Sequence, residues 1–463
     1  MTSVPAAAAI DSLRTALARR LAIRTESQIP AQAAELMRYL TAEIGPSLAA
    51  LGFRWTIWDN PVAGAPPLLF AERIEAPSLT TVLMYGHGDV VAGHDAQWRV
   101  ARSPWILEQQ GNRWYGRGSA DNKGQHSINI AAIAAVLATR GALGCNVKWL
   151  FEMGEEVGSP GLRAICETQR SALAADVFIA SDGPRLRAEL PTLFLGARGA
   201  LNFTLQCALR EGAHHSGNWG GLLANPGVIL AHAIASLVDA HGAISVPALR
   251  PQEIPASVRR ALATIEPGDS NGPAIDRDWG EPGLTPAQRV FAWNTLEVLA
   301  FKTGNPEQPV NAIPAHATAN LQVRFVAGCD HTTFMPALRA HLDRFGFERV
   351  QVKADPSDVM AATRLDPDHP WVTWAAQSIA RSSGIAAAIL PNMGGSLPND
   401  CFADVLKLPT LWVPHSYPAC SQHAADEHLL IDIAHQGLRI MIGLFEDLAD
   451  RQTRPVSDSG IVP

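Results

Sequence analysis

Short polar segments of this chain place histidine and carboxylate side chains directly after apolar runs or at the start of a helix. In chain order these side chains are His87, Asp89, Asp121, Glu155, Glu156, Asp182 and His423. Imidazole nitrogens and carboxylate oxygens together form the donor set of a hard or borderline divalent metal such as zinc. Each segment alone has an ordinary explanation as a turn or a helix cap, but the whole set favours a metal site.

The ordinary explanations stay open for individual residues. Asp121 lies in the glycine-rich stretch YGRGSADNKG before a predicted helix, where aspartate is a favoured N-cap residue. A phosphate loop is a further alternative, but Gly116 and Gly118 lack the third glycine of a dinucleotide-binding fingerprint. His87 and Asp89 alone would be a surface pair, although a ligand histidine commonly donates its second ring N–H to such a carboxylate.

Glu155 and Glu156 are adjacent and follow an apolar run in FEMGEEVGS. Adjacent buried carboxylates raise each other's pKa, so they need a compensating cation or a shared proton, whereas a solvated loop would tolerate them. Two histidines, three carboxylates and a spare glutamate suit two divalent cations that share one carboxylate and one water. Such a metal pair hydrolyses amides because it generates hydroxide at neutral pH and polarises the carbonyl.

The elements that must position these side chains have the pattern of an α/β protein. Apolar runs at 81–91, 146–156, 175–183 and 408–415 each end in polar residues, and a helical pattern covers 123–141. Such runs are typical of buried parallel strands, and ligands collect at the carboxyl ends of these strands. The alternation of strand and helix predicts a mostly parallel sheet that is covered on both faces.

The pattern changes in the middle of the chain. Alternating strands are predicted at 197–210, 316–328 and 347–353, and helices at 225–242 and 331–346. This order predicts a small antiparallel sheet with two helices on one face. We therefore predict a discontinuous catalytic, metal-binding domain (1–190 and 363–463) interrupted by a second domain (191–362), in which 247–286 is a loop-rich insertion.

Composition excludes several classes of partner. The chain carries 37 Lys+Arg against 44 Asp+Glu, a formal net charge of −7, and lacks a basic block. This balance disfavours nucleic acid and membrane surfaces and favours a small-molecule substrate. The 6 cysteines are scattered without a C-x-x-C pair, as in a reducing compartment. The apolar helical stretch from Ile128 is shorter than the roughly 20 residues of a membrane span, so we expect a cytoplasmic protein.

The blocks YGHGDV, YGRGSADNKG, GEEVGS and SDGP and the late His423, in this order, resemble the M20 family of metallopeptidases. That family includes carboxypeptidases, carnosinases, aminoacylases and desuccinylases, and the resemblance spans nearly the whole chain. It implies a catalytic domain of the zinc-exopeptidase type with an inserted α+β lid that also forms a homodimer. It also implies two Zn²⁺ per subunit, for which Co²⁺ or Mn²⁺ are possible substitutes.

The resemblance assigns a role to each residue of the predicted metal site. His87 and Asp182 would hold one metal, Glu156 and His423 would hold the other, and Asp121 would bridge the two. This assignment leaves Asp89 and Glu155 outside the set of ligands.

Further roles come from the same resemblance. Asp89 would orient His87, and Glu155 would be the general base that passes a proton from the bridging water to the leaving amine. His215, in HHSGNWGG, would stabilise the oxyanion in the active site of the partner subunit. Contacts to the substrate would come from Asn311, Arg324, Gly395 and Ser396.

The expected activity is hydrolysis of an amide or peptide bond next to a free carboxylate, of the dipeptidase or carboxypeptidase type, by a metal-bridging hydroxide. Deacylation of N-acyl amino acids, of the aminoacylase or desuccinylase type, is the alternative within this class. A non-catalytic binding protein of the same fold is disfavoured because the base and all five ligands are present. After His423 this chain has Ala424-Ala425-Asp426-Glu427, where relatives often carry Pro-Asn-Glu, so we expect Asp426 and Glu427 to shape this loop and not to bind metal.

Overall fold

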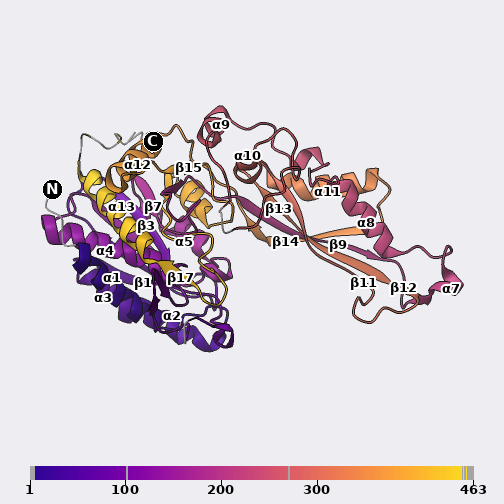
Figure 1. The fold of residues 1–463 in the computed structure, drawn as a ribbon, viewed down its shortest axis with the longest axis horizontal. Coiled ribbons are helices and arrows are strands. Elements are labelled where there is room, and N and C mark those ends of the chain that lie inside the picture. Colours follow the sequence, from indigo (N-terminus) through magenta and orange to yellow (C-terminus); the bar gives the residue numbers. More distant parts are fainter. Residues whose placement is uncertain (1–5, 101–102, 269–271, 451, 453–454, 456–463) are drawn as a thin grey trace.

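The computed structural model describes residues 6–100, 103–268, 272–450, 452 and 455, which form a larger and a smaller lobe (Figure 1). The larger lobe is built on an eight-stranded sheet with the order β1-β2-β6-β3-β7-β16-β8-β15. Its strands are β1 (Arg54–Trp58), β2 (Leu68–Arg73), β3 (Thr81–His87), β6 (Asn146–Glu152), β7 (Val177–Ala180), β8 (Thr192–Phe194), β15 (Ala388–Leu390) and β16 (Thr410–Trp412).

The centre of this sheet is parallel, as the sequence predicts. β6, β3, β7 and β16 are neighbours and pair in parallel, and each of them arises from one of the apolar runs. β1 and β2 add an antiparallel edge, because β1 pairs with β2 and β2 pairs with β6 in the opposite direction. Four adjacent parallel strands therefore bring their carboxyl ends to one edge of the larger lobe.

Alternate side chains of the central strands enter two separate cores. Met84 of β3 packs into the core formed with the long helices α1 (Ala6–Leu21), α4 (Lys123–Arg140), α12 (Pro370–Ser383) and α13 (Ile431–Ala449). Its neighbours Leu83 and Tyr85 enter the core on the other face, beneath the short helices α5 (Leu162–Thr168), α9 (Ala256–Leu262) and α10 (Pro286–Phe291). Burial on both faces explains why these strands are continuously apolar instead of alternating.

The smaller lobe contains a four-stranded antiparallel sheet with the order β11-β13-β9-β14. Its strands are β9 (Gly199–Ala208), β11 (Thr295–Thr303), β13 (His316–Phe325) and β14 (Val350–Met360), and α8 (Pro226–Leu237) and α11 (Phe334–Arg344) share a core with it. A two-stranded ribbon of β10 (His214–His215) and β12 (Ala312–Ile313) lies at the far end of this lobe (Figure 1). The domain boundaries predicted from the sequence, at 190/191 and 362/363, remain a prediction.

The region predicted as a loop-rich insertion contains a helix. α9 lies inside 247–286, and α10 begins at its end. Residues of both helices belong to the core of the larger lobe, so this segment packs against the eight-stranded sheet and not only against the smaller lobe. Among the described residues, no helix has the length and apolarity that a membrane crossing requires.

Candidate metal centre

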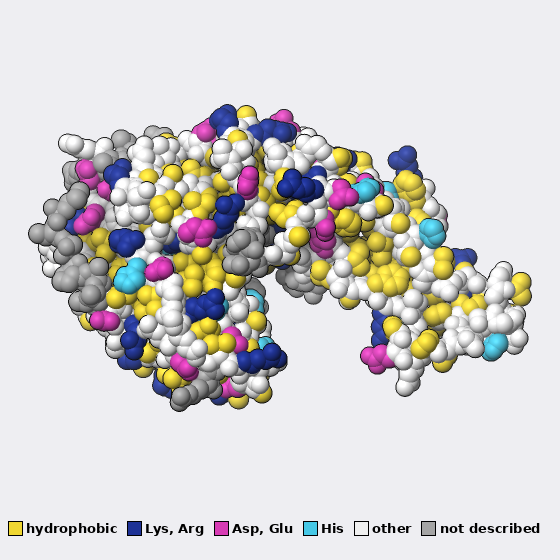
Figure 2. Space-filling model, viewed as in Figure 1, with side chains coloured by type: hydrophobic (Ala, Val, Ile, Leu, Met, Phe, Trp, Pro, Cys, Tyr) yellow, Lys and Arg dark blue, Asp and Glu magenta, His cyan; other side chains and the backbone are white. Residues whose placement is uncertain are grey.

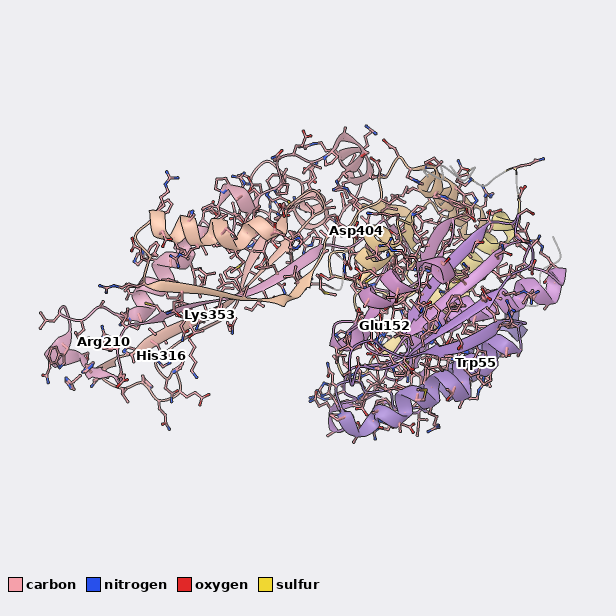
Figure 3. All side chains as sticks on the ribbon, turned by 180° about the vertical axis from the view of Figure 1, so that it is seen from behind. Trp55, Glu152, Arg210, His316, Lys353 and Asp404 are labelled. Atoms are coloured by element: carbon pink, nitrogen blue, oxygen red, sulfur yellow. The ribbon has the colours of Figure 1, made fainter. Side chains whose placement is uncertain are left out.

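The histidine and carboxylate side chains of the candidate site come from the ends of the central strands. His87 is the last residue of β3, and Asp182 lies two residues after the end of β7. The chain leaving β6 forms the short 3-10 helix η4 (Glu155–Val157), and Asp121 lies two residues before α4. Figure 2 shows a hollow between the two lobes. Glu152, the last residue of β6, is labelled in Figure 3 on the side of the larger lobe that faces this hollow.

The structure brings the five predicted ligands together. His87 Nε2 lies 3.0 Å from Asp121 Oδ1 and 3.5 Å from Asp182 Oδ2. His423 Nε2 lies 3.1 Å from the other oxygen of Asp121, Oδ2, and 3.1 Å from Glu156 Oε2. The side chains thus form two groups that could each hold a metal ion, and within each group the potential ligand atoms lie within 4.8 Å of one another. Asp121 belongs to both groups.

The charges of this cluster fit a bound cation. Hydrogen bonds to Asp121 and Glu156 raise the pKa of His423 to about 10. Burial raises the pKa of Asp182 to about 7, and the neighbouring Asp121 adds to this effect. One oxygen of Glu156, Oε1, is buried and has no hydrogen-bond partner among the described residues. An excess of buried carboxylates with a free acceptor oxygen is the environment that a divalent ion stabilises.

Asp89 connects the end of β3 to the segment after β6. Its carboxylate accepts hydrogen bonds from the backbone N–H groups of Glu155 at 3.2 Å and Glu156 at 3.1 Å. On the side of the ring opposite the cluster, His87 Nδ1 is hydrogen-bonded to the backbone carbonyl oxygen of Asp89 at 3.1 Å and lies 3.4 Å from the Asp89 carboxylate. Asp89 therefore fixes the orientation of His87 and the position of both glutamates at once.

Glu155 lies beside the cluster but belongs to neither group of potential ligands. Its side chain borders the same cavity as the cluster. Burial raises the pKa of the Glu155 carboxyl well above its ordinary value, and the nearby Asp182 and Asp121 raise it further. A carboxyl group with a raised pKa, free of metal and beside the reaction site, has the properties of a proton carrier.

The loop that carries Asp121 is anchored by Glu427. The carboxylate of Glu427 accepts hydrogen bonds from the backbone N–H groups of Gly118, Ala120 and Asp121 at 2.9 to 3.1 Å. It also pairs with the buried guanidinium of Arg117 at 2.6 Å. Glu427 thus fixes the loop that carries Asp121, and it is absent from both groups of potential metal ligands, as the sequence analysis expects.

The cluster opens into a cavity of about 780 Å³ whose lining comes from both lobes. Three of the predicted substrate contacts border this cavity, namely Arg324, Gly395 and Ser396. Arg324 Nη1 donates a hydrogen bond of 2.7 Å to Ser396 Oγ. The cavity therefore has a cluster of acids at one position and a guanidinium at another.

His215 and Asn311 do not border this cavity. They lie together at the two-stranded ribbon, where the N–H of Ser216 donates to the carbonyl oxygen of Asn311 at 2.9 Å. Figure 3 shows Arg210 and His316, which flank this ribbon in the sequence, at the end of the smaller lobe far from Glu152. Within one chain, the structure therefore separates these two predicted residues from the other ten.

Sequence reasoning missed two polar side chains near the site. Gln422 Nε2 donates a hydrogen bond of 2.5 Å to Asp121 Oδ2 and borders the cavity. Arg198 Nε donates to the carbonyl oxygen of Gly394 at 2.9 Å, and its carbonyl oxygen accepts from Ser396 Oγ at 2.8 Å. The only signal for Gln422 was its position next to His423, and Arg198 offered none beyond its place at the start of a predicted strand.

The family model for peptidases of family M20/M25/M40 matches residues 83–447. The chain therefore belongs to this family of metallopeptidases, and it is a metal-dependent hydrolase. The Beta-Ala-His dipeptidase of Mus musculus is 34% identical over 362 residues, which cover 74% of this chain and 70% of that enzyme. The Beta-Ala-His dipeptidase of Homo sapiens is 31% identical over 324 residues, and the match spans 61% of its length.

Solved structures share the same fold. Human carnosine dipeptidase 1 superposes with a TM-score of 0.76 at 22% identity, over 96% of this chain and 97% of that chain. An M20 family metallo-carboxypeptidase from Sulfolobus solfataricus superposes with a TM-score of 0.77 at 24% identity, over 94% of this chain and 98% of that chain. These likenesses confirm the predicted mixed α/β fold.

Proposed function

We propose that this protein is a dizinc dipeptidase-type hydrolase that cleaves an amide or peptide bond next to a free carboxylate. The observation that carries the proposal is the position of Asp121, whose two oxygens face two separate groups of potential ligands. The guanidinium of Arg324 borders the same cavity and would suit a carboxylate. The dipeptidase names of the matching relatives support this substrate class.

In this proposal, His87, Asp121 and Asp182 would hold one zinc ion, and Asp121, Glu156 and His423 would hold the other. The nitrogen and oxygen donors and the free Oε1 of Glu156 support the assignment. Cobalt or manganese would be accepted by the same donors. When bound, such a pair lowers the pKa of water and polarises a carbonyl group.

The chain's own residues handle the proton and the substrate. Glu155 takes a proton from the attacking water as the water oxygen bonds to the carbonyl carbon. It passes this proton to the amine nitrogen as the C–N bond breaks, so that the amine leaves as a neutral product and the hydroxyl stays on the acid. The carboxylate of Asp89 keeps Glu155 in place because it accepts a hydrogen bond from the backbone N–H of Glu155. Arg324 binds the free carboxylate of the substrate, assisted by the hydroxyl of Ser396 and the backbone of Gly395.

We also assign a role in substrate binding to the ribbon at the far end of the smaller lobe. His215 and Asn311 are exposed there and lie outside the cavity of their own chain. They would act in the active site of a second copy, where His215 donates a hydrogen bond to the developing oxyanion.

The second copy would dock on β11, one of the two edge strands of the four-stranded sheet in the smaller lobe. Val298, Leu299 and Phe301 of this strand are exposed, with Leu299 59% exposed. An exposed apolar edge strand is normally covered, because its free backbone groups pair readily with another strand. Hydrophobic side chains also gather on the surface of the smaller lobe in Figure 2. These features support a homodimer formed through the lid.

We expect charged substitutions on this strand to separate the dimer. The double variant Leu299→Lys, Phe301→Glu should be monomeric in sedimentation velocity, because the β11 strands of two copies would no longer bury apolar area against each other. The monomer should retain its metal and lose most of its activity, since His215 would lack a partner site. Phe345→Glu changes another exposed phenylalanine, just after α11, and is the control that should leave the dimer intact. A variant that stays dimeric would contradict the proposed interface.

A cytoplasmic location is part of the same proposal. All six cysteines are free in the structure, which is compatible with a reducing compartment.

The function is tested with a panel of dipeptides and N-acyl amino acids. The purified protein should contain about two divalent ions per chain, measured by elemental analysis. It should release amino acids from dipeptides, lose this activity after treatment with a chelator, and regain it with zinc. Hydrolysis of N-acyl amino acids alone would replace the dipeptidase by the deacylase alternative. Full metal occupancy without hydrolysis of any substrate would contradict the proposal.

A further inference from the structure

The cavity beside the metal cluster has a second, apolar part. Its wall includes Leu186, Phe194, Phe291, Leu390, Met393 and Leu397. Among the described residues that line the cavity, every carboxylate belongs either to the two groups of potential metal ligands or to the adjacent Glu155, and the only arginines are Arg185 and Arg324. This part of the cavity therefore offers apolar surface and no negative charge of its own.

One wall of this apolar part comes from the inserted segment and not from the catalytic sheet. α10 contributes Val290 and Phe291, which face Gly394 on the opposite wall. A Cβ atom at Gly394 would lie 3.6 Å from Val290 Cγ1 and 4.0 Å from Phe291 Cε1. A Cβ atom at position 394 would thus be in ordinary van der Waals contact with α10, and a larger side chain there would press against this helix.

α10 is held firmly enough to serve as a wall. Its N-terminus has a capping box, in which Thr285 Oγ1 accepts from the N–H of Gln288 and the Gln288 side chain accepts from the N–H of Thr285. The Arg289 Nε group donates to the carbonyl oxygen of Glu281 at 3.0 Å. Reciprocal capping and a tertiary anchor fix the rotation of the helix, so Phe291 keeps facing the core and the cavity.

The geometry also indicates which part of a substrate would enter this space. Ser396 and Arg324 are hydrogen-bonded to each other and are the proposed contacts for the free carboxylate. Met393 and Leu397 flank Ser396 closely in the sequence and line the apolar wall. The substrate residue whose free carboxylate binds at Arg324 therefore has its side chain nearest to the apolar surface.

We propose that the apolar part of the cavity is a subsite for the side chain of the C-terminal residue of the substrate, and that α10 is its selective wall. The enzyme then prefers substrates that end in a bulky apolar residue over those that end in glycine or lysine. This inference rests on the proposed peptidase function, because it takes the free carboxylate to be bound by Arg324.

A series of dipeptides that differ only in the C-terminal residue tests the preference. We expect kcat/KM for Ala-Leu and Ala-Phe to exceed that for Ala-Gly roughly 10- to 100-fold, because the larger side chains bury apolar surface in the subsite. Ala-Lys should be slower than Ala-Leu, since its ammonium group would be desolvated without a counter-charge. Equal or faster cleavage of Ala-Gly or Ala-Lys would overturn the subsite but leave the peptidase function standing. Failure to cleave any of them would instead contradict the function itself.

Substitutions at two positions of α10 test its role as the wall of the apolar subsite. Phe291→Ala should lower the ratio of Ala-Leu to Ala-Gly cleavage roughly 10-fold, whereas Phe345→Ala, the same change at an exposed site on the lid, should leave the ratio unchanged. Val290 is 36% exposed, so a polar side chain there can reach solvent, and Val290→Glu covers the case in which Phe291→Ala fails to fold. Relative to the neutral Val290→Gln, Val290→Glu should raise Ala-Lys cleavage about 2- to 5-fold against Ala-Leu. Unchanged ratios in both variants would overturn the role of α10.

Discussion

Glu155→Gln is expected to lower kcat roughly 10²- to 10⁴-fold while the metal content stays unchanged. The side chain borders the cavity but belongs to neither group of potential ligands, so its loss should not release metal. A glutamine has nearly the same shape and cannot accept and return a proton. Turnover with saturating dipeptide and elemental analysis of the same preparation check the two halves of this expectation.

The neighbouring residue supplies the matched comparison. Glu156 Oε2 lies 3.1 Å from His423 within one group of potential ligands, so Glu156→Gln should lower metal content as well as activity. Glu167→Gln, on the exposed surface of α5, should change neither quantity. Activity near the unmodified level in Glu155→Gln, or loss of metal from it, would remove Glu155 from the role of proton carrier.

The positions of the strand-end ligands were predictable because the central strands are buried on both faces. Continuous apolar runs before His87, Glu155 and Asp182 predicted neighbouring parallel strands, and the structure places β3, β6 and β7 side by side. Parallel strands bring their carboxyl ends to one edge by topology alone, so the sequence order of the polar residues was enough to predict their convergence. His423 lies shortly after the apolar run at 408–415, so the sequence suggested it as the residue that completes the set, and the family resemblance then assigned it to one of the two metals.

Other features escaped prediction for physical reasons that differ from case to case. β11 was missed because its residues are exposed at a sheet edge, so its apolar stretch Val298–Phe301 neither alternates nor forms a buried run. The contact of α10 with Gly394 joins segments about a hundred residues apart, and no local pattern predicts such a pairing. The hydrogen bond from Gln422 to Asp121 depends on the fold of two loops. Local patterns therefore predicted the acids of the site but not the wall that would select the substrate.

His215→Ala is expected to lower kcat roughly 10²- to 10³-fold with little change in metal content. His215 lies outside the cavity of its own chain, at the far end of the smaller lobe, so it should not affect the ligand cluster directly. Its imidazole is exposed and accepts a hydrogen bond from the N–H of Gly217 at 3.1 Å through Nδ1, which leaves Nε2 free to donate. His214→Ala, at the adjacent position of the ribbon, is the matched control and should retain most of the activity.

Mixing two inactive variants distinguishes action across the dimer from action within one chain. In a heterodimer of His215→Ala with Glu155→Gln, the active site of the His215→Ala subunit keeps its own Glu155 and would receive an intact His215 from its partner. Random pairing of equal amounts should therefore restore about a quarter of the unmodified activity, because half of the dimers would be mixed and each would have one complete site. If His215 acted within its own chain, no site in any of these dimers would hold both groups, and the mixture would stay inactive after subunit exchange.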